Sequence, residues 1–381
     1  MRFILVCVCC SLEQRFLGEP SANRVKWTRV FLNLLALLGT VAPLFIVWFV
    51  WRVISLAFPA HIYQKGDDVV FEFYQRFSLV LTETFLHIEV HLYGDFERVI
   101  DRRERALFIG NHQSATDWIA SNCIAERLGR LGQLRYFMKD LLQVFPLYGF
   151  YFHHHGCIYV NREQCDFDKM RRSLVYLQNK LIPSIVVLFP EGTRYQGPDK
   201  LSASDEFAEK NGLRKLRHVR YPRTRGLGTT IDYMRQNVDA LYDVTVIYGG
   251  TKGDNGTRLA APSLIDLFTG QCRSIHVHLE RIPIDDVPLD EDKIKEFLYT
   301  QFNKKEDLLA RYYEGPMDTS PFPGRALRRD LSRLRQAIAL VLMFALTVYF
   351  SLTGPGLSVS AQVWLVGTLF GYGWLFIGSV A

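Results

Sequence analysis

A histidine and an aspartate with the spacing of a catalytic pair follow a short apolar run. His112 and Asp117 lie in the polar stretch after Ala106–Gly110, and no other histidine of the chain has an aspartate five positions further on. A carboxylate that hydrogen-bonds one ring nitrogen of a histidine leaves the other free to take a proton from an alcohol. We therefore predict that His112 is a general base and that Asp117 orients it. Taken alone, the spacing also fits a loop histidine beside a helix-capping aspartate.

A second polar stretch follows the most hydrophobic run of the central chain, Ile185–Phe189. The backbone amides of a tight turn, a hydroxyl group and a guanidinium can together hold a phosphate. This stretch offers all three, and its candidate substrate-binding residues are Glu191, Gly192, Thr193 and Arg194. An ordinary salt-bridged turn is the alternative for these residues taken alone.

Two more cations stand where apolar runs end. Arg162 follows Cys157–Val160, and Lys139 follows Leu134–Met138. A cation at the end of a strand is usually a solvated charge, so neither position is specific by itself. Both residues are nevertheless candidates for contact with an anionic substrate.

Two other arrangements point to chemistry that we do not predict. His153, His154 and His155 are adjacent, and the side chains of an extended segment cannot all face one metal ion. Ser114 lies two residues from His112, but no G-x-S-x-G sequence surrounds it, which argues against a serine hydrolase. We predict neither a metal ion nor a bound cofactor.

The elements that must position these residues lie in the central chain. The predicted strands are Phe85–Tyr93, Ala106–Ile109, Leu134–Met138, Cys157–Val160, Ser184–Phe189, Tyr242–Tyr248 and Ser274–Arg281. The predicted helices are Thr116–Leu128, Asp166–Lys180, Ser202–Asn211, Thr229–Val238 and Asp290–Tyr313. This alternation predicts an α/β domain over residues 60–320, with a mixed sheet and covering helices.

An apolar run near the start of the chain predicts a membrane segment over residues 30–58, preceded by a short cytosolic segment, residues 1–29. Its length suits one crossing of a bilayer. Gly39 and Pro43 lie in its middle, however, so a bend there could also return the chain to the same side. We slightly favour the bent form, a helical hairpin.

Two apolar runs near the end predict membrane helices over residues 336–353 and 361–381. Thr353–Gly356 between them has the composition of a turn, so the two helices should form a transmembrane hairpin. Gly367 and Gly371 have the spacing of a helix-packing pair, although glycine is also simply tolerated in membrane helices.

Charge and cysteine content narrow the compartment and the partners. The chain of 381 residues has a formal net charge of +6, and an arginine cluster over residues 325–335 precedes an apolar run. Such a cluster is typical of a cytosolic flank that contacts anionic lipid headgroups, and no nucleic-acid recognition motif accompanies it. Of the seven cysteines, three lie within the first ten residues, and the other four (Cys123, Cys157, Cys165 and Cys272) are scattered with no C-x-x-C pair. We read this distribution as a reducing, cytosol-facing environment rather than a disulfide framework.

Taken together and in this order, the motifs resemble the glycerolipid acyltransferase family, and within it the 1-acylglycerol-3-phosphate acyltransferases of the epsilon branch. The resemblance covers the chain from about residue 25 to the C-terminal hairpin. The sequence blocks that carry it are Asn111–Ser114 with Asp117–Trp118, Leu147–Gly149, Gly156–Arg162, Pro190–Tyr195, Pro222–Thr224, Tyr242–Val246 and Ile275–His278.

The resemblance implies a reaction and its location. The enzyme would transfer a fatty acyl group from acyl-CoA, as co-substrate, to the sn-2 hydroxyl of lysophosphatidic acid, with membrane lipids as its surroundings. His112 and Asp117 would be the catalytic pair, and Arg162 with Glu191–Arg194 would bind the acceptor. The family default is a multi-pass protein of the endoplasmic reticulum with a cytosolic active site; a mitochondrial or nuclear envelope pool is the alternative.

Three alternatives remain open from sequence. Asp243–Val246 lacks the proline that many family members carry in this block, so a lysocardiolipin or lysophosphatidylinositol remodelling acyltransferase is the nearest one. A hydrolase would release fatty acid without an acceptor. A non-catalytic membrane protein would not need His112.

Overall fold

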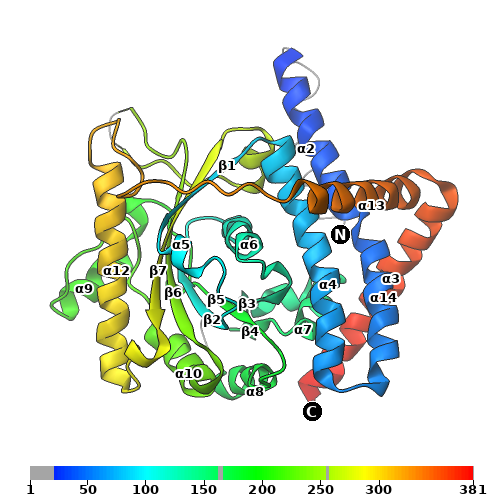
Figure 1. The fold of residues 1–381 in the computed structure, drawn as a ribbon, viewed down its shortest axis with the longest axis horizontal. Coiled ribbons are helices and arrows are strands. Elements are labelled where there is room, and N and C mark those ends of the chain that lie inside the picture. The colour runs from blue at the N-terminus through cyan, green and yellow to red at the C-terminus, as the bar shows by residue number, and fades with distance from the viewer. Residues whose placement is uncertain (1–20, 162–165, 255–256, 381) are drawn as a thin grey trace.

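The computed structural model describes residues 21–161, 166–254 and 257–380, and its centre is a sheet with helices on both faces (Figure 1). The strands are β1 Glu89–Gly94, β2 Ala106–Gly110, β3 Leu134–Lys139, β4 Ile158–Val160, β5 Ile185–Leu188, β6 Ala240–Tyr248 and β7 Ser274–Pro283. All seven predicted strands are confirmed, with ends that differ by a few residues. The first strand starts later than predicted, because residues 80–85 form a π-helical turn.

The sheet is mixed, as predicted. Its strand order is β1-β7-β6-β2-β5-β3-β4. Strands β6, β2, β5, β3 and β4 are parallel to one another, whereas β7 is antiparallel to β6 and parallel to the edge strand β1. The carboxyl ends of the five parallel strands therefore meet at one edge of the sheet.

Helices cover both faces of this sheet, and the apolar helices α2, α3, α13 and α14 lie to one side of it (Figure 1). The helices are α2 Ser21–Gly39, α3 Val41–Ile54, α4 Ala60–Leu79, α5 Phe96–Val99, α6 Asp117–Arg127, α7 Tyr148–His154, α8 Phe167–Leu177, α9 Ser202–Lys210, α10 Thr224–Met234, α11 Leu264–Phe268, α12 Glu291–Tyr313, α13 Arg333–Leu352 and α14 Gly354–Val380. The five predicted helices of the central domain are confirmed, although α10 begins five residues before its predicted start.

The alternation of side chains along β2 divides the core into two layers. Ala106 and Phe108 pack with α4 and α6, whereas Leu107 and Ile109 pack with α8, α10 and α12. All nine residues of β6 are buried, since helices cover both of its faces. This double cover explains why the strands of the sheet centre appear in the sequence as continuous apolar runs.

The N-terminal apolar run does not reverse at Gly39–Pro43. Helix α3 continues downwards from α2 in Figure 1, and the chain turns back only after Ile54, so that α4 returns alongside α3. The indole of Trp51 donates a hydrogen bond of 2.8 Å to the Tyr63 carbonyl across this pair. The bend that we favoured in the apolar run is therefore wrong, and residues 24–57 are long and apolar enough to cross a membrane as one segment.

The C-terminal hairpin is confirmed, with a shorter connection than predicted. Helices α13 and α14 are both long and apolar enough to cross a membrane. The turn is confined to Thr353, and α14 begins at Gly354 rather than at residue 361. Pro355 lies in the first turn of α14, where backbone amides have no partner within the helix. The missing amide hydrogen of proline therefore costs the helix no hydrogen bond.

Candidate active site

The predicted site residues come from neighbouring parallel strands. His112 follows β2, the 191–194 turn follows β5, and Lys139 ends β3, so the strand order β2-β5-β3 brings all of them to one edge of the sheet. Ligand sites of α/β sheets form at this edge. Arg162 follows the next strand, β4, but lies outside the described residues.

His112 and Asp117 form the predicted pair. The Nδ1 atom of His112 lies 2.8 Å from Asp117 Oδ2, and the imidazole stacks on the Phe189 ring with centroids 4.8 Å apart. Among the described residues, no hydrogen-bond partner lies at His112 Nε2, and the side chain is 12% exposed. The geometry leaves this nitrogen free to accept a proton from a bound hydroxyl group.

Asp117 is surrounded by hydrogen-bond donors at the start of α6. Its Oδ2 atom also accepts hydrogen bonds from the backbone amides of Gln113 and Ser114, at 2.7 and 3.0 Å. Its Oδ1 atom accepts one from the Tyr248 hydroxyl at 2.7 Å. Burial raises the pKa of Tyr248 well above its ordinary value, so this phenol keeps its proton and donates it. A carboxylate with four donors has one fixed orientation, and it fixes the imidazole in turn.

Glu191 lies beneath the 191–194 turn rather than on its open side. Its Oε1 atom accepts the His112 amide at 2.7 Å, and its Oε2 atom accepts the Arg220 amide at 2.9 Å. The residue is 3% exposed, and burial raises the pKa of its carboxyl group to about 8, against the effect of the two amide hydrogen bonds. We predicted that Glu191 binds substrate, but its place in the structure is that of a positioning residue.

The loop that carries His112 is bound to β6 by the side-chain amide of Asn111, which makes the two hydrogen bonds that a strand backbone would make. Asn111 Oδ1 accepts the Val246 amide at 2.8 Å, and Asn111 Nδ2 donates to the Val246 carbonyl at 3.2 Å. Gln113 Nε2 donates to the same carbonyl at 2.6 Å. The β2–β6 pairing is thereby extended past Gly110 into the loop that carries His112.

Arg258 clamps this loop from the opposite side. Its guanidinium donates to Gln113 Oε1 and to the His218 carbonyl. It also lies over the rings of Tyr195 and Tyr313, at 4.0 and 4.6 Å from their centroids. One cation thus ties together the loops that follow β2, β5 and β6.

The open side of the 191–194 turn carries the remaining predicted residues. Thr193 and Arg194 are exposed, and among the described residues the Arg194 guanidinium has no hydrogen-bond or ion-pair partner. Gly192 has a φ of 70°, and a Cβ atom there would lie 3.1 Å from Arg223 Nε. Glycine is therefore required at the turn. Lys139 is also exposed, at the same edge of the sheet.

Two residues of the site were not predicted from sequence. Tyr248 is the last residue of the buried strand β6, which lies next to β2. A buried tyrosine hydroxyl requires a hydrogen-bond partner, so the position of Tyr248 at the end of an apolar run could have indicated a role in the site. Arg258 lies in an irregular loop, and its sequence context gives no signal of the contact with Gln113.

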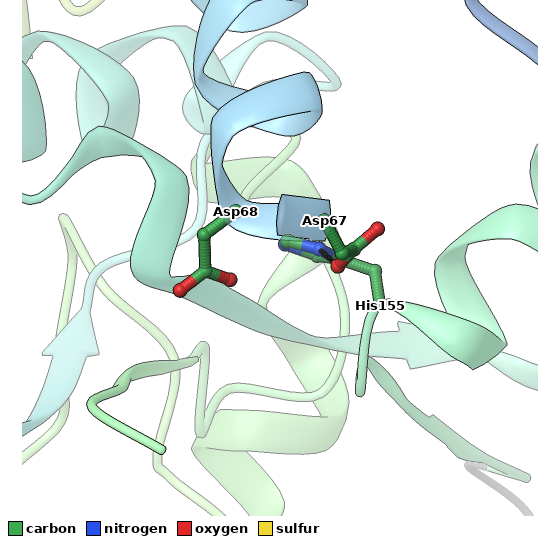
Figure 2. A group of neighbouring side chains, drawn as sticks. All are labelled: Asp67, Asp68 and His155. Atoms are coloured by element: carbon green, nitrogen blue, oxygen red, sulfur yellow. Dashed lines mark hydrogen bonds and ion pairs between the residues drawn. The ribbon is translucent and has the colours of Figure 1, made fainter. Parts of the chain in front are cut away.

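A second polar cluster lies away from this edge, where α4 meets α7 and β3. Asp67, Asp68 and His155 place ligand-type atoms within 4.8 Å of one another, and Asp67 faces the imidazole ring (Figure 2). His155 Nδ1 lies 2.6 Å from Asp67 Oδ2, and Arg135 Nη2 lies 2.5 Å from Asp68 Oδ1. Because Arg135 Nη1 is also 2.8 Å from His155 Nε2, its guanidinium supplies the cation of the cluster. The cluster has the make-up of a buried ion-pair network.

We expected the run His153–His155 to be extended, but it lies at the end of a helix. His153 and His154 lie in α7, and only His155 enters the network. Burial lowers the pKa of His155, which favours a neutral ring that donates to Asp67 and accepts from Arg135. The three adjacent histidines therefore diverge because the segment is helical, and not for the reason we gave.

An α/β sheet with a His–Asp pair at its carboxyl edge, joined to apolar helices, defines a membrane-associated acyltransferase. Residues 87–248 match the family model described as acyltransferase, and residues 266–345 match the one described as acyltransferase C-terminus. Both catalytic candidates and the 191–194 turn lie within the first match.

Comparison with known proteins identifies the family. The chain is 36% identical to the mouse 1-acyl-sn-glycerol-3-phosphate acyltransferase epsilon over 354 residues, which are 92% of this chain and 96% of the mouse protein. The chain belongs to the 1-acyl-sn-glycerol-3-phosphate acyltransferase family. It is also 31% identical to chicken lysocardiolipin acyltransferase 1, over 56% of this chain and 55% of that protein. The crystal structure of the LPA acyltransferase PlsC from Thermotoga maritima aligns with a TM-score of 0.43 and 18% identity, over 74% of this chain and 98% of the other.

Proposed function

We propose that this enzyme transfers a fatty acyl group from acyl-CoA to the sn-2 hydroxyl of lysophosphatidic acid, which yields phosphatidic acid. The observation that carries the proposal is the His112–Asp117 pair, whose Nδ1–Oδ2 distance of 2.8 Å leaves Nε2 free at the open edge of the sheet. The printed name of the mouse relative supports lysophosphatidic acid as acceptor.

The geometry of the pair supports the following mechanism for the proposed reaction. His112 Nε2 takes the proton of the acceptor hydroxyl while the oxygen attacks the thioester carbonyl. Asp117 holds the ring and stabilises its charged form, and Tyr248 together with the loop amides holds Asp117. The C–S bond then breaks, and the proton on His112 passes to the leaving thiolate. General-base assistance of this kind contributes roughly 10²- to 10⁴-fold in rate.

The acceptor phosphate would bind on the open side of the 191–194 turn. Arg194 offers an exposed guanidinium, Thr193 an exposed hydroxyl, and Lys139 a second cation at the same edge. Arg162, from the end of β4, would complete the set. Pairing of a guanidinium with a phosphate fixes its orientation as well as its position, which places the sn-2 hydroxyl at His112.

A remodelling reaction on another lysophospholipid is the second candidate. The similarity to chicken lysocardiolipin acyltransferase 1 and the absence of proline from Asp243–Val246 favour it. Competition between lysophosphatidic acid, lysocardiolipin and lysophosphatidylinositol at equal concentrations separates the two functions.

Three helices are long and apolar enough to cross a membrane, which makes this a membrane protein. We propose that it lies in the endoplasmic reticulum, with the active site on the cytosolic side. The buried, unpaired state of Cys123, Cys157 and Cys272 is compatible with a reducing compartment. Protease protection of a tag on α12 in sealed microsomes tests the orientation, and co-localisation with organelle markers tests the membrane.

The decisive experiment is an assay of microsomes with labelled oleoyl-CoA and lysophosphatidic acid. Wild-type protein should form labelled phosphatidic acid, and His112→Ala should not, whereas His61→Ala, in α4 outside the site, should behave as wild type. Equal activity of wild type and His112→Ala would overturn the mechanism. Labelled fatty acid without phosphatidic acid would instead indicate a hydrolase.

A further inference from the structure

The segment that follows β3 exposes an unusual number of apolar side chains. Leu141, Leu142, Val144 and Phe145 are 62%, 43%, 50% and 37% exposed. They follow Lys139 within six residues, in a short 3₁₀ turn over residues 140–144 and the residue after it. Only Gln143 separates Leu141 and Leu142 from Val144 and Phe145, and clustered exposed apolar side chains on a folded domain mark a contact surface. We call residues 140–145 the apolar segment.

The apolar segment is fixed against the last membrane helix. The Tyr372 hydroxyl of α14 donates a hydrogen bond of 2.8 Å to the Val144 carbonyl. Leu147, which has a φ of 62° and is 2% exposed, packs against Gly367 of α14. A Cβ atom at Gly367 would come within 2.6 Å of Leu147 Cδ2. A Cβ atom at Gly367 would also come within 3.2 Å of Phe45 Cε1 in the membrane helix α3, so the small-residue face of α14 packs against a neighbouring membrane helix, as expected, and against the central domain as well.

The exposed face of α14 indicates which surroundings the apolar segment has. Leu365, Val366 and Leu369 are 63%, 62% and 62% exposed, and α14 has the length and composition of a membrane-spanning helix. An apolar surface of this kind needs a hydrocarbon surrounding. The hydrogen bond of Tyr372 to the Val144 carbonyl places the apolar segment directly beside α14. We propose that the apolar segment inserts into the lipid bilayer beside α14.

This contact has a consequence for the position of the active site. Lys139 directly precedes the apolar segment and lies at the same sheet edge as His112 and the 191–194 turn. With the apolar segment in the hydrocarbon, Lys139 stands at the level of the lipid phosphates, where cations are favoured. The edge that carries the site then faces the membrane surface, from which a lipid acceptor can enter. The insertion itself does not depend on which reaction the site performs.

Photocrosslinking of the full chain in lipid nanodiscs tests the proposal. Benzoylphenylalanine replaces Leu141 in the apolar segment, Leu369 in α14 as the positive control, or Leu289 as the matched control. Leu289 is a similarly exposed leucine (57%), and it comes two residues before α12, a helix that lies on the opposite side of the molecule from α14 in Figure 1. After irradiation with tritiated phosphatidylcholine, position 141 should carry severalfold more label than position 289 and a level comparable with position 369.

Two outcomes overturn the insertion. Label at position 141 no higher than at position 289 would place the apolar segment outside the lipid, whether or not position 369 is labelled. A crosslink from position 141 to a second copy of the chain would make this surface a protein interface. Lipid label at position 141 in a protein without acyl transfer would leave the insertion standing and refute only the proposed reaction.

A second pair of variants tests the role of α14. Gly367→Leu should displace Leu147 and lower the label at position 141 severalfold. Gly373→Leu should not, because nothing lies within 4 Å of a Cβ atom there. Equal label in both variants would contradict the docking of the apolar segment on α14.

Discussion

Glu191 and His112 are joined through the main chain, since the His112 amide donates to Glu191 Oε1 at 2.7 Å while both His112 ring nitrogens face elsewhere. The carboxyl group of Glu191 therefore sets the position of the loop that carries His112 rather than the chemistry of the imidazole. Its second oxygen holds the Arg220 amide in the same way. Any effect of Glu191 on substrate binding is then indirect, through the two loops that it connects.

This arrangement predicts a pH-dependent stability that Glu191→Gln removes. Burial raises the pKa of Glu191 from its ordinary value of 4.5 to about 8. The folded state then binds the proton more tightly than the unfolded state, so the free energy of unfolding contributed by this group falls as pH rises from about 4.5 to about 8. Thermal unfolding in detergent across this range should show a steeper decline for wild type than for Glu191→Gln. Parallel curves would contradict the raised pKa.

Tyr248→Phe should impair catalysis without impairing binding. The change removes the hydroxyl that donates to Asp117 Oδ1 at 2.7 Å and leaves the ring packed. A hydrogen bond to a charged group contributes about 1.5–3 kcal/mol, so kcat should fall about tenfold or more while KM for both substrates stays constant. Tyr242→Phe, on the same strand but bonded to Glu104, serves as the control. A normal kcat for Tyr248→Phe would show that the backbone amides alone fix Asp117.

Arg258→Lys should also lower kcat, because lysine keeps the positive charge but lacks the planar guanidinium group with its several N–H donors. The guanidinium uses separate nitrogens for Gln113 and His218 and stacks between two tyrosine rings, which an ammonium cannot reproduce. We expect a loss of about tenfold in kcat, with smaller changes in KM, from the loss of one charge-assisted bond. Steady-state kinetics of Arg258→Lys check this expectation. The control is Arg225→Lys, which changes an exposed arginine of α10. Equal values for the two variants would refute the clamp.

Arg194→Ala should act on the acceptor alone. Its guanidinium is exposed and has no ion-pair partner among the described residues, so its removal leaves the fold intact. KM for lysophosphatidic acid should rise about tenfold or more, as expected for the loss of a charged hydrogen bond, while KM for acyl-CoA stays unchanged. Arg172→Ala, an exposed arginine of α8, is the matched control. A rise in KM for acyl-CoA instead would place Arg194 at the donor.

The strands and the contact between His112 and Asp117 could be predicted because their signals are local. Residues 240–248 form an apolar and β-branched run interrupted only by Asp243, and His112 and Asp117 lie within one loop of each other. Their partners come from distant parts of the chain: Tyr248 is 131 residues from Asp117, and Arg258 is 145 residues from Gln113. Only the fold brings such pairs together, so spacing in the sequence carries no signal for them.

Helix α4 was not predicted for a different physical reason. Its buried face contains Gln64, Asp67 and Asp68, whose polarity hides the amphipathic period that identifies a helix. These side chains are buried because Arg135 and His155 neutralise or bond them, and both partners come later in the chain. The role of Glu191 was missed in a similar way, since its partners are backbone amides that have no residue-specific signal.

The α4 network also constrains how the chain is made. Asp68 leaves the ribosome 67 residues before its partner Arg135, and Asp67 leaves it 88 residues before His155. During that interval the carboxylates need water, because an unpaired charge in hydrocarbon is costly. The preceding apolar helix can enter the membrane at once, whereas we expect α4 to stay on the aqueous side until β3 and α7 emerge. Membrane insertion should therefore precede folding of the central domain, and α4 is the element on which that folding depends.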